Sequence, residues 1–324
     1  MSVETSGISN TEKNLGITKI GDNEFRGIKP LSKPSPNSRG VYGGNLCGQS
    51  IIAAMETVPE GFVPHSLHSY FIAAGEDTVP CDYKIEELSN GKNFANRLVR
   101  VSQNNQLKYM VMISLTKRNS IKLTKNNFEK NDKNMRPFEY QLPPGSSFFE
   151  HKDTVEKLPY FNYNSVNKNT ILQHKLTPEF STIDDSEFDK TPGERQLSFF
   201  IKLNDQSLPT SYRYGSMGLV TDSLYLTSVS RILHLPTKDG KTLGSSGGVN
   251  HNFFSVSLDH SIYFHDDDFD PTNWLYFMYQ SPRFSNNRVL FTGGYYNDKG
   301  KLIASIAQEG LVFFKNDADL RARL

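Results

Sequence analysis

The sequence contains little cysteine, no long apolar run and almost no net charge. Two cysteines, Cys47 and Cys81, are too few for a disulfide framework and lack the spacing of metal ligands, so we expect a reducing compartment, with Cys47 as a small buried hydrophobe in the first apolar helix. No apolar run reaches the length of a membrane-spanning helix, and the polar N-terminal segment lacks the apolar core of a signal peptide, so a secretory route is not expected. The net charge of +1 gives no reason to expect nucleic acid or an anionic membrane as the main partner.

The motifs of several large enzyme classes are also missing. The chain has no G-x-S-x-G elbow, no H-E-x-x-H, no P-loop and no G-x-G-x-x-G opening a helix. We therefore expect neither a metal ion nor a cofactor. What remains is a chain of 324 residues with 36% hydrophobic and 22% charged residues, which is long enough and apolar enough for two globular modules.

The chain contains one pattern twice. GGNLCGQSIIAAMETV, HSLHSYFIAAG and NRLVRVSQNNQLKYMVMISL near the start resemble GLVTDSLYLTSVSRIL, SVSLDHSIYF and NRVLFTGGYYNDKGKLIASIAQEGLVFF near the end. Each set predicts an apolar helix, a strand with a His-Ser pair and a long hairpin of alternating apolar residues. Because repeated units bury each other's hydrophobic faces, we expect a pseudo-dimer of two modules.

The expected elements define the fold class. Helices are predicted at residues 44–58 and 222–234, and strands at 67–73, 81–88, 95–103, 107–115, 196–203, 253–264, 274–281, 288–296 and 302–314. Because hairpins and not βαβ crossovers join the strands, the fold class is α+β, with a curved antiparallel sheet wrapped around a long helix in each module. Two such sheets placed edge to edge would cover an otherwise open edge.

The expected domain boundaries follow from composition. We place an N-terminal module at residues 1–117, with a flexible lead-in at 1–20, and a C-terminal module with the candidate catalytic residues at 191–324. Residues 118–190 are rich in Asn, Lys, Pro and Asp without clear periodicity, so they are expected to form a surface connector that isolated aromatic residues pin down.

Three polar residues of the second copy stand out as candidates for chemistry. Asp222 lies at the start of the expected second helix, where free N–H groups and the helix dipole favour a carboxylate, so we expect it to be ionised at neutral pH. Ser257 lies on a strand two residues before Asp259. Gln308 interrupts an apolar run and must find hydrogen-bond partners if it is buried. A carboxylate, a hydroxyl and an amide suit a hydrolase that uses water directly.

The histidines of the two copies favour a different interpretation. His68 and His260 occupy matching places in the sequence, and this symmetry favours a structural role for both. Asp259 and His260 with Ser257 suggest a triad, but neighbours in a strand point to opposite faces and cannot form a relay.

The long matched segments identify a family. VYGGNLCGQSIIAA, HSLHSYFIAAG, NGKNFANRLVRVSQ, TDSLYL, SLDHSIYFH and ASIAQEG resemble, in this order, the acyl-CoA thioesterase II family. The resemblance implies a double hotdog fold and hydrolysis of fatty acyl-CoA, of medium to long chain, to free fatty acid and CoA. It also implies that Asp222, Ser257 and Gln308 activate the attacking water, with Ser257 in place of the family's more usual Thr and with no covalent acyl-enzyme.

The chain departs from the family pattern at two places. Ala73-Ala74-Gly75 replaces an Arg-Pro-Gly, and Asp266-Asp267-Asp268 stands where the family carries a basic residue, so the contacts to CoA phosphates are expected to differ. Two alternatives remain open: a hydratase that uses Asp259 and His260, and an acyl-CoA-binding module without catalysis. Further dimerisation into a homo-oligomer is also expected from exposed module surfaces.

The last three residues suggest a destination. Ala322-Arg323-Leu324 is a small-basic-leucine tripeptide related to the S-K-L peroxisomal address, and it follows a polar stretch that a receptor could reach. We expect recognition by the peroxisomal import receptor and a location in the peroxisomal matrix.

Overall fold

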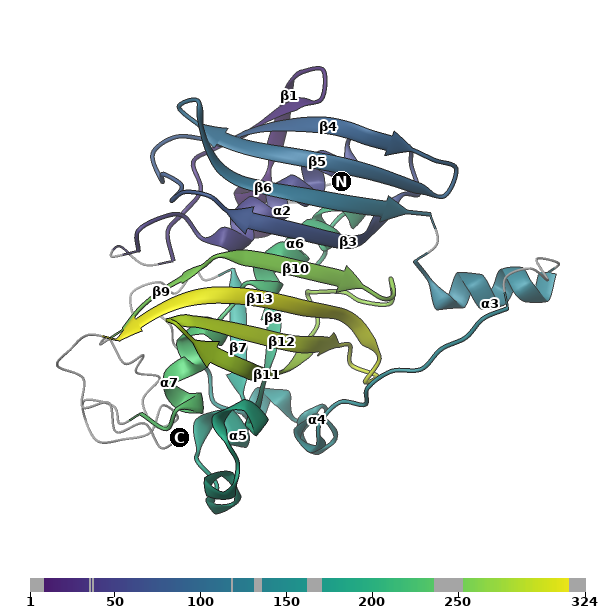
Figure 1. Ribbon diagram of the computed structural model, residues 1–324. Coiled ribbons are helices and arrows are strands. Elements are labelled where there is room, and N and C mark those ends of the chain that lie inside the picture. Colours follow the sequence, from purple (N-terminus) through teal and green to yellow (C-terminus); the bar gives the residue numbers. More distant parts are fainter. Residues whose placement is uncertain are drawn as a thin grey trace, which may run out of the picture.

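One continuous antiparallel sheet organises the protein. The computed structural model describes residues 9–34, 36, 38–117, 119–130, 136–161, 171–235 and 253–314. The strands of these residues follow the order β1-β2-β4-β5-β6-β3-β10-β13-β12-β11-β8-β7, and β9 pairs with β13 (Figure 1). Their bounds are β1 (Ile17–Gly21), β2 (Glu24–Gly27), β3 (Val63–Phe71), β4 (Asp82–Asn90), β5 (Phe94–Gln103), β6 (Gln106–Thr116), β7 (Leu172–Leu176), β8 (Gln196–Leu203), β9 (Phe253–Ser257), β10 (Asp259–Phe264), β11 (Leu275–Ser285), β12 (Arg288–Tyr296) and β13 (Leu302–Phe314).

The two halves of the sheet meet at β3 and β10. These strands pair antiparallel, with Leu67 opposite Ile262 and Ser69 opposite His260. Figure 1 shows the N-terminal strands and the C-terminal strands as neighbouring parts of one curved layer. The edge-to-edge arrangement predicted from the sequence is therefore confirmed, and each half covers an edge of the other.

Two helices, α2 (Gly43–Met55) and α6 (Thr210–Thr221), cross at very short range beneath the sheet. A Cβ atom added to Gly48 would lie 2.6 Å from the carbonyl oxygen of Gly215, and one added to Gly218 would lie 2.6 Å from the amide nitrogen of Gly48. The helices thus touch backbone to backbone, and any side chain at these positions would push them apart.

The position of the second helix differs from the prediction. The helix expected at residues 222–234 precedes that range as α6, and Asp222 is its C-terminal cap. Residues 222–235 instead form short turns, η4 (Tyr225–Ser228) and α7 (Val229–Ile232), after Leu224 adopts a positive φ of 71°. The sequence of α6, TSYRYGSMGLVT, has many residues with low helix propensity, so packing against α2 stabilises it more than its own preference does.

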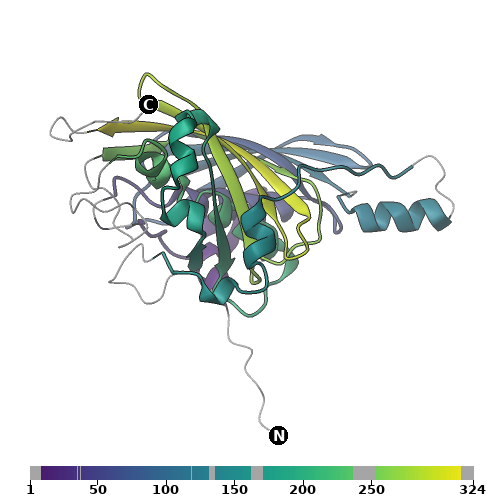
Figure 2. The ribbon, with the colours of Figure 1, turned by 90° about the horizontal axis from the view of Figure 1, so that it is seen from below.

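The connector contains more regular structure than predicted. It forms α3 (Ile121–Lys130), α4 (Ser146–His151), η1 (Val155–Lys157), α5 (Pro178–Ser181) and η2 (Asp185–Asp189), and η3 (Pro192–Glu194) follows it. Its strand β7 pairs with β8 as the last strand of the sheet. Phe148 and Phe161 are buried and fix the connector to the sheet, whereas α3 has no buried residue and extends away from the sheet (Figure 2).

The expected lead-in is partly packed. Residues 9–21 form α1 (Asn10–Leu15) and β1, and Leu15 is completely buried between α2 and α6. The side chain of Asp205 accepts hydrogen bonds from the backbone of Asn10 and Thr11 and so holds the start of α1. Among the described residues, no helix has the length and apolar character needed to cross a membrane.

Candidate active site

Asp222 lies where the end of one central helix meets the start of the other. It caps the C-terminus of α6, and its carboxylate accepts a hydrogen bond from the backbone N–H of Gly44 in the first turn of α2. Gly43 has no room for a side chain, because an added Cβ atom would lie 2.8 Å from Oδ2 of Asp222. The hydroxyl of Tyr42 donates to the carbonyl oxygen of Leu219 at 2.7 Å and ties the two helix ends together.

Ser257 and Gln308 converge on the same carboxylate. Gln308 Nε2 lies 2.8 Å from Asp222 Oδ1 and 2.8 Å from Ser257 Oγ, and the Ser257 hydroxyl lies 3.5 Å from Asp222 Oδ1. Gln308 is completely buried on β13, as its apolar surroundings predicted, while Asp222 and Ser257 are half-buried. The three residues named from the sequence are therefore brought together by α6, β9 and β13.

The electrostatic setting of Asp222 differs from the expectation. Burial raises the pKa of Asp222 to about 7, against the opposing effects of the hydrogen bonds from Gln308, Gly44 and Ser257. The dipole of α6 disfavours a negative charge at its own C-terminus, so the stabilising N-terminus is that of α2. The prediction that Asp222 is ionised because it lies at the start of its own helix is therefore wrong in its reason, and burial favours the protonated form. Such a carboxyl can both take and return a proton near neutral pH.

The side chain of His260, which was assigned a structural role from the sequence, lies behind Asp222, Ser257 and Gln308. Nδ1 of His260 contacts Oε1 of Gln308, and Nε2 lies 3.0 Å from Oγ1 of Thr221. His68, by contrast, is exposed and contacts Ser261. The symmetry inferred between the two histidines does not hold, because HSYF and HSIYF differ by one residue and place them on opposite faces. The side chain of Asp259 accepts from the backbone N–H of Glu309 instead, so Asp259 and His260 do not form a pair for hydratase chemistry.

Other buried groups line the back of the site. Burial raises the pKa of Cys47 to about 12, although the nearby hydroxyl of Tyr109 acts in the opposite direction. Cys47, which was predicted to be buried, and Cys81 are both free thiols in the core. In the described part of the chain, no group of three or more His, Cys, Asp and Glu side chains is arranged to hold a metal ion.

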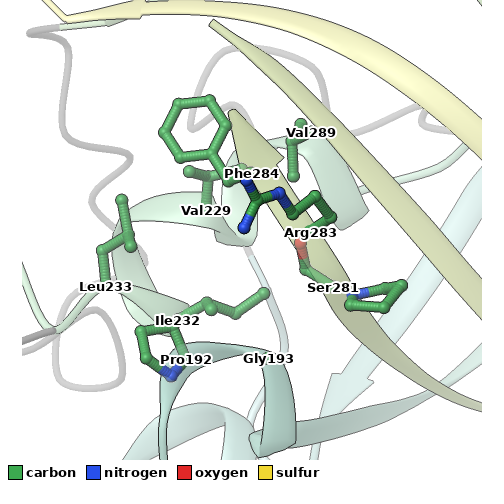
Figure 3. A pocket seen from close by; sticks show the side chains of 10 residues that line it. Pro192, Gly193, Val229, Ile232, Leu233, Ser281, Arg283, Phe284 and Val289 are labelled. Atoms are coloured by element: carbon green, nitrogen blue, oxygen red, sulfur yellow. The ribbon is translucent and has the colours of Figure 1, made fainter. Parts of the chain in front are cut away.

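An apolar cavity lies elsewhere in the C-terminal half. It has a volume of about 220 Å³ and lies between α7, η3 and β11, where Ile232, Leu233 and Phe284 contribute apolar walls (Figure 3). None of the three candidate catalytic residues lines it. The candidate active site is therefore defined by its convergent polar groups and not by this cavity.

Comparisons with known proteins first define the class. The fold is similar to that of the acyl-CoA thioesterase II TesB2 from Mycobacterium marinum, with a TM-score of 0.69, 20% identity and coverage of 94% of this chain and 99% of that one. It is also similar to a hot dog fold protein from Alicyclobacillus acidocaldarius, with a TM-score of 0.60, 16% identity and coverage of 94% and 97%. The protein thus has the double hotdog fold.

The family follows from the sequence comparisons. The acyl-CoA thioesterase N-terminal domain matches residues 31–116, and the acyl-CoA thioesterase C-terminal domain matches residues 166–312. The chain is 27% identical to peroxisomal acyl-coenzyme A thioester hydrolase 1 of Saccharomyces cerevisiae, covering 100% of both chains. It is 25% identical to acyl-CoA thioesterase 2 of Haemophilus influenzae, covering 93% of this chain and 96% of the relative. The chain belongs to the acyl-CoA thioesterase II family and is a thioester hydrolase.

Proposed function

We propose that this thioesterase hydrolyses fatty acyl-CoA by direct attack of a water molecule held by Asp222, Ser257 and Gln308. The observation that carries the proposal is the convergence of the three side chains on one point, with a carboxyl group whose pKa burial raises to about 7. A base with a pKa near the working pH transfers protons most effectively.

The mechanism follows from these contacts. Asp222 accepts a proton from the water molecule while the water oxygen forms a bond to the thioester carbonyl carbon. The N-terminal end of α2, which begins at Gly43, favours negative charge at this place and so stabilises the developing oxyanion. When the carbon–sulfur bond breaks, Asp222 returns the proton to the leaving thiolate. The products are the free fatty acid and CoA, and no bond to the protein forms.

Ser257 and Gln308 orient the reactants. Gln308 Nε2 donates to both the carboxylate and the serine hydroxyl, which keeps Oδ1 of Asp222 directed toward Ser257. Pre-set donors of this kind act without reorganisation during the reaction.

Release of free thiol from palmitoyl-CoA and decanoyl-CoA tests the proposal. Asp222→Asn keeps the shape of the side chain but removes the base, so kcat should fall by about 1,000-fold. Asp259→Asn is the matched control, because an amide oxygen can still accept from the Glu309 backbone, and it should retain activity. An active, folded Asp222→Asn enzyme would contradict the proposed mechanism. Loss of activity in Asp259→Asn together with hydration of an enoyl-CoA by the wild type would favour the hydratase alternative.

We further propose that Ala322-Arg323-Leu324 directs the protein to peroxisomes through the import receptor. The tripeptide lies outside the described residues, and the proposal is supported by its likeness to the S-K-L address and by the peroxisomal name of the yeast relative. An N-terminal fluorescent fusion should be punctate with the full chain and diffuse after deletion of Leu324. A punctate signal after the deletion would contradict this role.

A further inference from the structure

A buried imidazole lies directly behind the candidate active site. His260 is 1% exposed, and its two ring nitrogens contact Gln308 Oε1 and Thr221 Oγ1. Its backbone is held from both sides, because β10 pairs with β3 and with β13 and because Ser69 Oγ donates to the His260 carbonyl oxygen at 2.8 Å. The ring therefore has a fixed place relative to the Gln308 amide.

The hydrogen-bond partners determine where the ring proton lies. Gln308 Nε2 donates to Asp222 and Ser257, so its carbonyl Oε1 faces His260 and needs a donor there. Burial lowers the pKa of His260 to about 4, so the ring is neutral at working pH and carries a single N–H. The contact with Gln308 Oε1 requires that proton on Nδ1, whereas the Thr221 hydroxyl donates its own proton to the carbonyl oxygen of Met217 at 2.6 Å and does not determine the tautomer.

The opposite tautomer would reverse the amide. With the proton on Nε2, the lone pair of Nδ1 would face Oε1 of Gln308, and two acceptors would be in contact. Rotation of the amide by half a turn would relieve that contact, but it would direct Oε1 at the carboxylate of Asp222. The orientation of Gln308 and the tautomer of His260 are thus coupled.

We propose that His260 is a positioning residue that holds the Gln308 amide with Nε2 toward Asp222 and Ser257. The proposal rests on the proposed function, in which Asp222 and Gln308 act on the attacking water. His260 itself does not touch the substrate in this arrangement.

A matched pair of variants tests the donor directly. The amide of Asn can occupy the place of Nδ1 and donate to Gln308, whereas the amide of Gln occupies the place of Nε2 and cannot. His260→Gln should lower kcat by about 10- to 100-fold, as loss of a supporting hydrogen bond to an active group does. His260→Asn should stay within about threefold of the wild type, with KM changed less than about twofold in both.

The pH profile provides a readout that a merely structural role would not move. Gln308 is the largest influence lowering the pKa of Asp222, so its reorientation in His260→Gln should shift the acid limb of kcat to higher pH. Other titratable groups that interact with Asp222 in the described part of the chain include Cys47 from α2, Tyr109 from β6 and Tyr295 from β12. Burial raises the pKa of all three far above the acid limb, so the shift reports on Asp222.

Nitrogen NMR of the histidines supplies a test that needs no active variant. The wild-type signal of His260, assigned by its absence in either variant, should show the Nδ1-protonated neutral tautomer. The Nε2-protonated tautomer would overturn the proposal, even if both variants were inactive.

The outcomes separate this inference from the proposed function. Full activity of folded His260→Gln, or equal losses in His260→Gln and His260→Asn, would overturn the positioning role while Asp222→Asn remained inactive. An active Asp222→Asn would instead refute the mechanism on which both rest.

Discussion

The strands β3 and β10 meet at the centre of the sheet and carry the same His-Ser pair, yet their histidines face opposite sides. His260 lies opposite Ser69 and faces the helices, whereas His68 lies opposite Ser261 on the exposed face, where its ring packs edge-on at 5.4 Å from that of Tyr263. Residues directly opposite each other in an antiparallel pair share a face, so a difference of one residue exchanges the faces. A match between repeated sequences therefore does not establish that two residues have the same environment.

The cross-strand neighbours extend this difference. Ser69 lies opposite the apolar Val111 of β6, whereas His260 contacts the amide of Gln308 on β13. The side-chain contact with Gln308 thus belongs to the C-terminal half, whereas the Ser69 hydroxyl donates to the backbone carbonyl oxygen of His260. One of the two halves carries the candidate catalytic groups, and the other contributes the start of helix α2.

The largest effect on kcat in this comparison is expected when one residue on each face of β13 is substituted separately. Gln308→Glu replaces the inward donor with a second carboxylate beside Asp222, so kcat should fall by about 100-fold or more. Glu309→Gln, its neighbour, removes only a half-exposed ion pair with Arg288 and should leave kcat within about twofold. Steady-state thiol release measures both, and similar losses in the two variants would contradict the difference between the faces.

The contact between the helices should respond to a single methyl group. Gly218→Ala places a Cβ atom against the backbone of Gly48, so the free energy of unfolding should fall by about 1–3 kcal/mol. Gly193→Ala is the control, because its nearest neighbour would be 3.4 Å away, an ordinary contact. Denaturant titration compares the two variants. Equal stability would mean that the helices can separate without cost.

Stability should depend on pH through Asp222. Its pKa is raised from 3.8 in the unfolded chain to about 7 in the folded chain, so the folded protein binds the proton more tightly. The stabilisation is therefore present at low pH and is lost as the pH rises toward 7 and above. Asp222→Asn stays neutral, so its melting temperature relative to the wild type should be higher at pH 8 than at pH 5, on the order of a few degrees. Scanning calorimetry at both pH values measures this, and a difference of the opposite sign would contradict the raised pKa.

The smallest expected effect belongs to the outward histidine. His68→Ala removes an exposed contact with Ser261 and the ring contact with Tyr263, so the unfolding free energy should change by less than about 1 kcal/mol. Thiol release should be unchanged. A loss of activity comparable to that of His260→Gln would show that the face of the sheet does not distinguish the two residues.

These differences explain which features of the fold and of the candidate site could be predicted from the sequence. The strands β8, β12 and β13 were predicted to the residue, and the burial of Gln308 was predicted from its apolar neighbours, because runs of apolar, aromatic and β-branched residues are local signals. The helix α6 was misplaced, because its Gly, Ser and Tyr residues are helical through contact with α2 and not through their own preference. The role of Asp222 was assigned to the wrong helix for the same reason.

Two other features could not be read from local patterns. His260 was assigned a structural role, because the extra residue in HSIYF changes its face only once β10 is paired with β3. The strand β7 lies within a stretch rich in Asn and Lys, and its pairing with β8 depends on the rest of the sheet. Both are consequences of long-range pairing.

The crossing of α2 and α6 also bears on how the two halves can change over generations. The acid belongs to the C-terminal cap of one helix, and the N–H that binds it belongs to the first turn of the other. A substitution in either half that shifts the crossing of α2 and α6 therefore affects the same reaction. A duplicated chain of this kind can lose one of its two ancestral sites, but its halves cannot then diverge independently or be exchanged separately between relatives.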